Sequence, residues 1–436
     1  MSSVRDVLSS MTSFEAIKFV LNGIALHDLQ CVDIMKMLYQ KKAIVSYDTG
    51  TGKTLLASAA IRLLYDEDPT RKFVIFVKKD QLTQTPKKMS DATGLSVISS
   101  SGEAARLDSL LRGDKFLNYP ILMLTHSCLL NHRVMKALFM HREKYCAVII
   151  DEAHEISNEY YAEAASIVSG IVAQAEYAWA LTATPITTDS KQLAKLASLI
   201  DKRKFPSEKK LERAINNGYF TIEQDPTFFI NRSGEELGRK SNYRGKILWV
   251  DAMAQQHADT SGDPLMLLCK GDGAIAQANA LCNLIKSYEG RRGLVYINQH
   301  AVRNWVLPFL DRAGIKYGCI NGKTNVTTTS EVLRQFNEEK SLDVVITSCT
   351  TAIDLDCDFV IFYEFTVLLK QMIGRADRGL QGKTVDIWYI ITRGSNEPAY
   401  FNESIIKRST MIQEVLSKDY TELDNIADDL YQELNR

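Results

Sequence analysis

Short apolar runs of four to seven residues recur along the chain, separated by longer segments in which polar and apolar residues mix. The first series is AIVSY (43–47), FVIFV (73–77), ILML (121–124), AVII (147–150) and YAWALT (177–182). The second is GLVYI (293–297), YGCI (317–320), DVVIT (343–347), FVIFY (359–363) and VDIWYII (385–391). Apolar runs rich in β-branched residues are typical of parallel strands covered by helices on both faces. The pattern therefore predicts an α/β fold that occurs twice.

The chain of 436 residues has room for two domains of about 150–200 residues each. We expect an N-terminal domain over 1–230, a polar connecting segment over 231–264 and a second domain over 265–410. Residues 411–436 contain seven acidic and two basic side chains, and they predict an acidic amphipathic terminal helix.

Composition excludes several classes of protein. No apolar run approaches the length of a membrane-spanning helix, and the N-terminus lacks the pattern of a secretory signal. The eight cysteines are scattered without zinc-ligand spacing, so we expect no zinc site and a reducing, cytoplasmic location. The net charge of −1 gives no global signature of a nucleic-acid-binding protein.

The segment YDTGTGKT (47–54) follows the first apolar run and precedes a helical stretch, which is the context of a phosphate-binding loop. Gly50 and Gly52 allow a tight turn whose N–H groups point at phosphates, and Lys53 adds a positive charge. The hydroxyl of Thr54 is placed to ligate Mg²⁺. The nucleotide-binding residues predicted here are Thr49, Gly50, Thr51, Gly52, Lys53 and Thr54. The expected ligands are ATP and Mg²⁺.

A carboxylate pair, Asp151 and Glu152 of DEAH (151–154), directly follows the AVII run. Ligands of open parallel sheets bind at the carboxyl ends of the strands. We expect Asp151 to hold Mg²⁺ through water, and Glu152 to orient or deprotonate the attacking water.

The second domain carries QMIGRADRG (371–379), with Gln371, Arg375 and Arg378. Arginines three apart share one face of a helix. Phosphoryl transfer needs positive charge at the γ-phosphate, which the guanidinium group supplies. Charge supplied from a second domain would make hydrolysis depend on domain closure.

In this order, the phosphate loop, DEAH, LTATP (181–185) and QMIGRADRG resemble the motifs of superfamily 2 helicases and translocases. The resemblance covers about residues 25–395. It implies two tandem RecA-like domains, each a mainly parallel sheet flanked by helices, with ATP in the cleft between them. That family often lacks the first glycine of the phosphate loop, where this chain has Tyr47.

The resemblance also implies further roles. FVIFVKKDQL (73–82) is similar to motif Ia, with Lys78 in place of the usual proline. VVITSCTTAIDL (344–355) is similar to motif V, with Ala352 in place of a common glycine. Gln30 resembles the glutamine that reads adenine. The implied nucleotide contact in motif V is Asp354, the implied coupling residues are His154, Thr182 and Thr184, and the implied nucleic-acid contacts are Lys79, Thr125, His126, Asn298, Thr324 and Thr347.

Within superfamily 2, the helical segment and FFINRSGEEL that follow LTATP resemble Swi/Snf-like enzymes, in a compact form of the phage, viral or bacterial kind. The favoured hypothesis is an ATP-dependent translocase or helicase on duplex or branched DNA, acting as a monomer or recruited by a partner, without a membrane. An RNA helicase of DEAH or DEAD type, a motor subunit of a defence or restriction complex, and a nucleotide-gated binding protein remain open.

Overall fold

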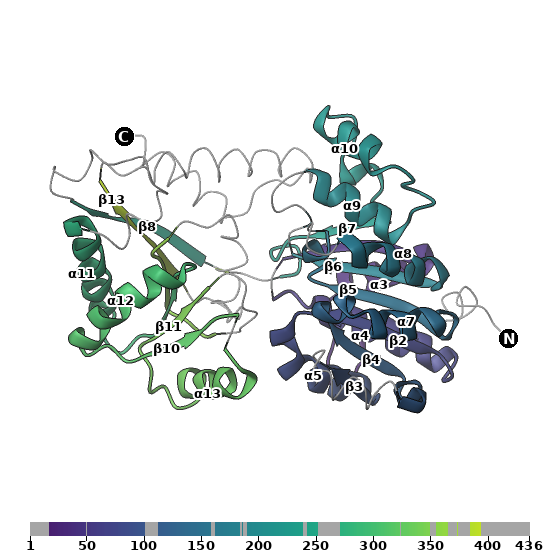
Figure 1. The fold of residues 1–436 in the computed structure, drawn as a ribbon, viewed down its shortest axis with the longest axis horizontal. Coiled ribbons are helices and arrows are strands. Elements are labelled where there is room, and N and C mark those ends of the chain that lie inside the picture. Colours follow the sequence, from purple (N-terminus) through teal and green to yellow (C-terminus); the bar gives the residue numbers. More distant parts are fainter. Residues whose placement is uncertain are drawn as a thin grey trace. The chain divides into compact units, whose positions relative to one another are not determined.

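The fold was analysed in a computed structural model, which describes residues 17–48, 50–100, 112–157, 162–183, 185, 190–238, 242–251, 271–322, 324–348, 355–364, 373 and 384–393. The chain divides into two compact units, and the first boundary between them lies between Leu237 and Gly238. Each unit has its own parallel sheet (Figure 1).

The first unit is built on a seven-stranded sheet of order β3-β4-β2-β5-β6-β1-β7. Its strands are β1 (Lys42–Tyr47), β2 (Lys72–Val77), β3 (Val97–Ser100), β4 (Ile121–Thr125), β5 (Tyr145–Asp151), β6 (Tyr177–Thr182) and β7 (Phe229–Arg232). Its helices are α3 (Asp28–Gln40), α4 (Lys53–Glu67), α5 (Thr85–Thr93), α7 (His132–Met140), α8 (Ala162–Gln174), α9 (Ser190–Ile200) and α10 (Glu208–Asn216). Short 3-10 turns are η1 (Lys79–Thr83), η2 (Arg112–Asn118), η3 (His126–Leu130), η4 (Arg142–Lys144), η5 (Ala153–Glu155) and η7 (Ile222–Gln224).

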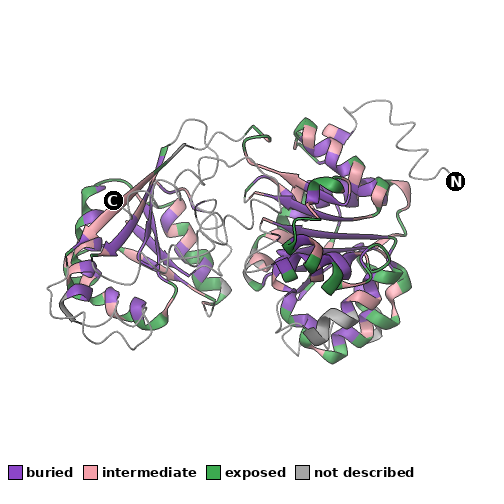
Figure 2. Cartoon of the chain, turned by 90° about the horizontal axis from the view of Figure 1, so that it is seen from above, coloured by how far each residue is buried: buried purple, intermediate pink, exposed green. Residues whose placement is uncertain are grey.

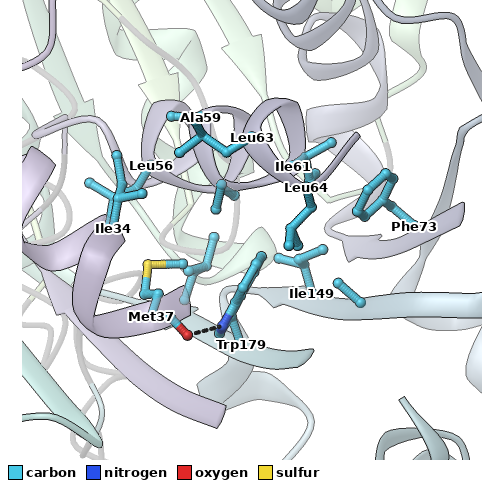
Figure 3. Close-up of a cluster of buried hydrophobic side chains, with 14 of the residues drawn as sticks. Ile34, Met37, Leu56, Ala59, Ile61, Leu63, Leu64, Phe73, Ile149 and Trp179 are labelled. Carbon is cyan, nitrogen blue, oxygen red and sulfur yellow. Dashed lines mark hydrogen bonds between the residues drawn. The ribbon is translucent and has the colours of Figure 1, made fainter. Parts of the chain in front are cut away.

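Helices cover both faces of this sheet, which explains why its strands are apolar throughout. On one face, α3, α4 and α5 share a buried core with alternate residues of the strands. Trp179 of β6 lies in this core, and its indole N–H donates to the backbone carbonyl of Met37 at 3.3 Å (Figure 3). On the other face, α9 contacts β1 and β6.

The second unit is built on a six-stranded parallel sheet of order β10-β11-β9-β12-β13-β8. Its strands are β8 (Asn242–Val250), β9 (Gly293–Tyr296), β10 (Tyr317–Ile320), β11 (Val344–Thr347), β12 (Phe359–Phe362) and β13 (Thr384–Thr392). One face packs against α13 (Val326–Asn337), and the other packs against α11 (Gly271–Ser287) and α12 (His300–Ala313). Buried residues fill most strands of both sheets (Figure 2), whereas β3 and β8 are mostly half-buried.

The prediction of two α/β domains with parallel sheets is confirmed, and all ten predicted runs contain strands. One expectation is corrected. The segment 231–264 is more than a connection, because Arg232 ends β7 and residues 242–250 form β8, which pairs in parallel with β13 along nine residues. Because that segment is polar in composition, its sequence does not indicate the edge strand, whose described side chains are mostly half-buried.

The described residues contain no helix long and apolar enough to cross a membrane. The predicted acidic helix over 411–436 lies outside the described residues.

Candidate active site

The order of strands in the first sheet brings the predicted motifs to one edge. Strands β4, β2, β5, β6 and β1 are successive neighbours and all run parallel, so their carboxyl ends lie side by side. The segments that follow these strands lie along this edge in the same order, and they begin after Thr125, Val77, Asp151, Thr182 and Tyr47. Segments that are distant in sequence therefore form one continuous row, as expected for a ligand site of a parallel sheet.

The phosphate-loop segment turns through two glycines with left-handed backbones. Gly50 has φ 76° and Gly52 has φ 93°. A side chain at Gly52 would also collide with Gln30, because an added Cβ would lie 2.7 Å from Gln30 Nε2. Helix α4 then starts at Lys53 without a side-chain cap, so its first N–H groups face the loop. A loop of this shape can receive an anion between the loop amides and the helix N-terminus.

Lys53 is buried at the start of α4. Its ammonium group donates to the backbone carbonyls of Tyr47 at 2.8 Å and Asp48 at 3.2 Å. The Thr51 hydroxyl donates to the same Asp48 carbonyl at 2.6 Å. Thr54 follows in the first turn of the helix and is half-buried. The ammonium group thus stays within reach of the loop that would hold the phosphates.

Gln30 is buried in the first turn of α3, against the phosphate loop. Its Nε2 donates to the carbonyl of Thr51 at 2.9 Å, and its Oε1 accepts the His27 N–H at 2.9 Å. The second bond is part of a capping box at the start of α3. The structure therefore ties Gln30 to the loop, and a contact with adenine stays a prediction.

Tyr47, where the general loop pattern has glycine, has its side chain in the core. Its hydroxyl donates to Asp33 Oδ2 at 2.7 Å, and Asp33 is fully buried. Arg232 makes a two-pronged contact with the same carboxylate, at 2.8 and 3.0 Å. The turn after β7 also reaches the loop, since the Gly234 N–H donates to Asp48 Oδ2 at 2.7 Å. Tyr47 thus joins α3, the loop and the end of β7.

Asp151, the last residue of β5, is buried with both oxygens engaged. Oδ1 accepts the Glu152 N–H and Oδ2 accepts the Gln81 amide, each at 3.0 Å. Burial and the neighbouring Glu152 raise the pKa of Asp151 to about 6, while the positive charge of Lys53 opposes the rise. A carboxylate held in this way is suited to a divalent cation, whose charge would restore ionisation.

Glu152 has a left-handed backbone, with φ 49°, which is uncommon for a residue with a side chain. Its Oε2 lies 3.5 Å from His154 Nδ1, and the same nitrogen lies 3.0 Å from the hydroxyl of Thr182. Burial lowers the pKa of His154 to about 4, so this imidazole is neutral near pH 7. The DEAH segment and the LTATP segment are therefore joined by a buried contact.

The predicted nucleic-acid contacts fall into two groups. Lys79 and Asn298 are exposed and Thr324 is half-buried, whereas Thr125, His126 and Thr347 are buried. The expectation for His126 needs correction, because its Nε2 lies 2.8 Å from the Asp151 carbonyl and its Nδ1 3.4 Å from Glu155.

The two buried threonines are also engaged within the protein. The Thr125 hydroxyl contacts the Ser127 hydroxyl at 2.7 Å. The Thr347 hydroxyl donates to the Ser348 carbonyl at 3.2 Å. The turn η3 follows β4 directly and packs against it, with Thr125 and His126 buried there.

In the second unit, the loop after β9 is held by a carboxylate that sequence reasoning missed. Glu364, just after β12, is buried and accepts the N–H groups of Asn298 and Gln299, at 3.0 and 3.3 Å. Burial raises the pKa of Glu364 to about 7. The exposed Asn298 side chain is thus presented by a fixed backbone.

Sequence reasoning also missed Asp33, Gln81 and Glu155. Gln81 was visible as a polar residue shortly after a buried strand, and Glu155 as the residue after DEAH, but no spacing rule connects them to Asp151.

Six residues predicted for the site lie outside the described residues, namely Thr49, Thr184, Asp354, Gln371, Arg375 and Arg378.

The donor set of the first unit fits a magnesium nucleotide. It offers loop amides, one ammonium group and one buried carboxylate, which match the phosphate oxygens and the water shell of Mg²⁺. Among the described residues, no three His, Cys, Asp or Glu side chains gather as metal ligands. Mg²⁺ commonly takes much of its coordination shell from water and from substrate phosphate oxygens.

Comparisons with known proteins identify a matching family model in each unit. A family model described as type III restriction enzyme, res subunit, matches residues 13–187, and one described as helicase conserved C-terminal domain matches residues 276–380. Among solved structures, the chain is similar to the Sulfolobus solfataricus SWI2/SNF2 ATPase core in complex with dsDNA. That match is 15% identical, covers 92% of this chain and 99% of that chain, and has a TM-score of 0.45. No curated protein matches the chain. From the two family matches, one in each unit, the chain belongs to the superfamily 2 helicases and translocases, which hydrolyse ATP.

Proposed function

We propose that the protein is a translocase that moves on duplex or branched DNA and is driven by hydrolysis of magnesium ATP. The observation that supports this most strongly is the row of motif segments at the carboxyl edge of the first sheet. In this row the phosphate loop follows β1 and DEAH follows β5, and the exposed Lys79 follows β2, the neighbour of β5. A single sheet edge can thus serve both a nucleotide and a polymer.

In this mechanism, Lys53 and the amides of the loop and α4 bind the phosphates, and Gln30 contacts adenine. Mg²⁺, when bound through Thr54 and Asp151, would neutralise charge that develops on the transferring phosphoryl group. Glu152 accepts a proton from the attacking water, and the His154–Thr182 contact couples this segment to the one after β6. Arg375 and Arg378 supply positive charge at the γ-phosphate, the neutral amide of Gln371 contributes hydrogen bonds in the same catalytic segment, and Asp354 contacts the same nucleotide.

The nucleic-acid contacts are assigned to Lys79, Asn298 and Thr324, with backbone amides near Thr125 and Thr347. Contacts of this kind hold phosphates without reading sequence, which suits a motor that must step along any strand. DNA is preferred because LTATP, FFINRSGEEL and RGLQ (378–381) resemble Swi/Snf-like enzymes. Such a motor would work in the cytoplasm, alone or recruited by a partner.

A second candidate is a motor subunit of a restriction or defence complex. It is favoured by one observation, the match of residues 13–187 to the family described as type III restriction enzyme, res subunit. Cleavage would then have to come from a partner chain. Co-purification of a nuclease with the tagged protein from its source would favour this candidate.

The test is steady-state ATPase activity with no polymer, single-stranded DNA, duplex DNA, a forked junction or single-stranded RNA. Strong stimulation by duplex or forked DNA is expected. Stimulation by RNA alone would move the protein to the RNA helicases. No stimulation by any of these polymers would contradict a nucleic-acid motor and favour a nucleotide-gated binding protein.

A further inference from the structure

The turn η1 carries an exposed basic side chain and, two residues later, a half-buried amide side chain. Lys79 is exposed at its start, and Gln81 lies two residues further on. Gln81 Oε1 accepts the backbone N–H of Lys78 at 2.9 Å, and Gln81 Nε2 donates to Asp151 Oδ2 at 3.0 Å. Because the backbone N–H selects the amide oxygen, the NH₂ group must point at the carboxylate.

A ring of polar contacts among Lys78, Glu155 and His126 lies beside the same turn. Lys78 Nζ lies 2.5 Å from one oxygen of Glu155, and His126 Nδ1 lies 3.4 Å from the other. The second nitrogen of His126 lies 2.8 Å from the backbone carbonyl of Asp151. The turns after β2, β4 and β5 are therefore tied together around Asp151.

The charges in this ring are compatible with its burial. The side chain of Lys78 is 8% exposed and that of Glu155 is 27% exposed. Burial works against ionisation of Glu155, but its contacts with His126 and Lys78 hold its pKa at about 2. An ionised pair with further hydrogen bonds is a stiff connection, because separating it would leave a buried charge without a partner.

We propose that Gln81 is a positioning residue for the metal-binding carboxylate of Asp151, and that it links this carboxylate to the turn bearing Lys79. The inference rests on the proposed function, in which Lys79 contacts a nucleic-acid phosphate. Asp151 Oδ1 is already held by the neighbouring Glu152 N–H, so the bond from Gln81 to Oδ2 fixes the rotation of the carboxylate. A phosphate at Lys79 stabilises the η1 turn in the arrangement that keeps Gln81 against Asp151.

The metal part of the inference is tested without any polymer. Gln81→Met keeps the length of the side chain but removes both the donor to Asp151 and the acceptor of the Lys78 N–H. The matched control is Gln84→Met, because Gln84 is exposed at the end of the same turn and makes no capping bond. Mn²⁺ replaces Mg²⁺ as the probe, and its binding in the presence of ADP is followed by electron paramagnetic resonance. We expect Gln81→Met to weaken Mn²⁺ binding about tenfold, as loss of a hydrogen bond to a metal ligand commonly does, and Gln84→Met to match wild type.

The link to the polymer is tested by ATPase stimulation and by DNA affinity. With saturating metal, we expect Gln81→Met to reduce the ratio of DNA-stimulated to basal turnover about fivefold or more. The affinity for duplex DNA without nucleotide should stay unchanged. The change in that affinity on adding a non-hydrolysable ATP analogue should shrink, because coupling of binding is reciprocal.

The outcomes separate this inference from the proposed function. Wild-type Mn²⁺ affinity in Gln81→Met, or an equal loss in Gln84→Met, would overturn the positioning role. A wild-type stimulation ratio in Gln81→Met would overturn the link to Lys79. Should wild type itself ignore every polymer, the proposed function fails, and the Mn²⁺ titration still decides the role of Gln81. Circular-dichroism melting verifies folding, and Gln81→Leu provides a second substitution.

Discussion

Glu152 combines a strained backbone with the position expected of the catalytic base. Its φ of 49° follows directly from the end of β5, where the chain turns sharply into η5. Such conformations cost roughly 1–3 kcal/mol and persist where the surroundings enforce them, often at active sites. The DEAH segment therefore meets two requirements, a fixed backbone and a carboxylate directed toward His154.

Glu152→Gln should bind ATP but turn it over at least about a hundredfold more slowly, because the amide cannot accept the proton of water. ATP affinity is measured with a fluorescent analogue and turnover by phosphate release. Glu143→Gln, a change of the same kind at an exposed position before β5, should match wild type. Wild-type turnover in Glu152→Gln would remove the catalytic role of this residue.

Glu364 predicts a pH dependence of stability. Its usual pKa of 4.5 rises to about 7 in the folded protein because of burial. Between these two values the folded chain keeps a proton that the unfolded chain releases. The free energy of unfolding therefore falls as pH rises, by roughly 1.4 kcal/mol per pH unit in that window.

Glu364→Gln cannot titrate and should lack this slope. Urea unfolding of both proteins between about pH 5 and about pH 8 gives the difference in their free energies of unfolding. We expect the variant to gain on wild type as pH rises toward 7. Parallel curves would show that Glu364 is not protonated in the folded state near neutral pH.

At the scale of elements, the first sheet is tied to its phosphate loop by a buried polar junction of α3, β1 and β7. Tyr47 occupies the place of a glycine because its hydroxyl meets Asp33, which in turn binds Arg232. The same turn after β7 reaches the loop through Gly234. Residues close to the boundary between the two units therefore contact the proposed phosphate loop.

Tyr47→Phe should lower the free energy of unfolding by about 2 kcal/mol, because it removes a buried hydrogen bond to a carboxylate. The matched control is Tyr39→Phe, whose ring is 62% exposed, and its effect should stay within about 0.5 kcal/mol. Both are measured by urea unfolding. An equal effect of the two substitutions would contradict a stabilising junction.

The elements most open to prediction were those with two buried faces. Strands such as β2 and β12 are apolar at nearly every position, which leaves few alternatives. The edge strand β8 is not evident from its sequence, because residues such as Arg244 and Lys246 interrupt its apolar pattern. Its place is decided by pairing with β13, far along the chain, which no local pattern reveals.

The same limit applies to the site. Lys53, Asp151 and Glu152 stand in local motifs and could be predicted from spacing. Gln81 and Glu155 could not, because their roles arise only where β2 and β5 become neighbours in the sheet. His126 shows a further limit, because the motif resemblance predicted a nucleic-acid contact whereas the fold directs its ring inward against Asp151.

On the scale of the whole molecule, the functional residues are divided between two units. The phosphate loop and DEAH belong to the first, and the matched helicase C-terminal region belongs to the second. In the proposed mechanism, a reaction that needs groups from both units would depend on domain closure, and this dependence would convert hydrolysis into movement. A translocase must do more than turn over ATP, because it must also move along the polymer.

The most direct measurement is displacement of a fluorescent third strand from a DNA triplex by the protein moving along the duplex. We expect release of the third strand with ATP and Mg²⁺, but not with a non-hydrolysable analogue or with Glu152→Gln. Strong DNA-stimulated hydrolysis without release, or equal release without hydrolysis, would contradict a motor that moves on duplex DNA.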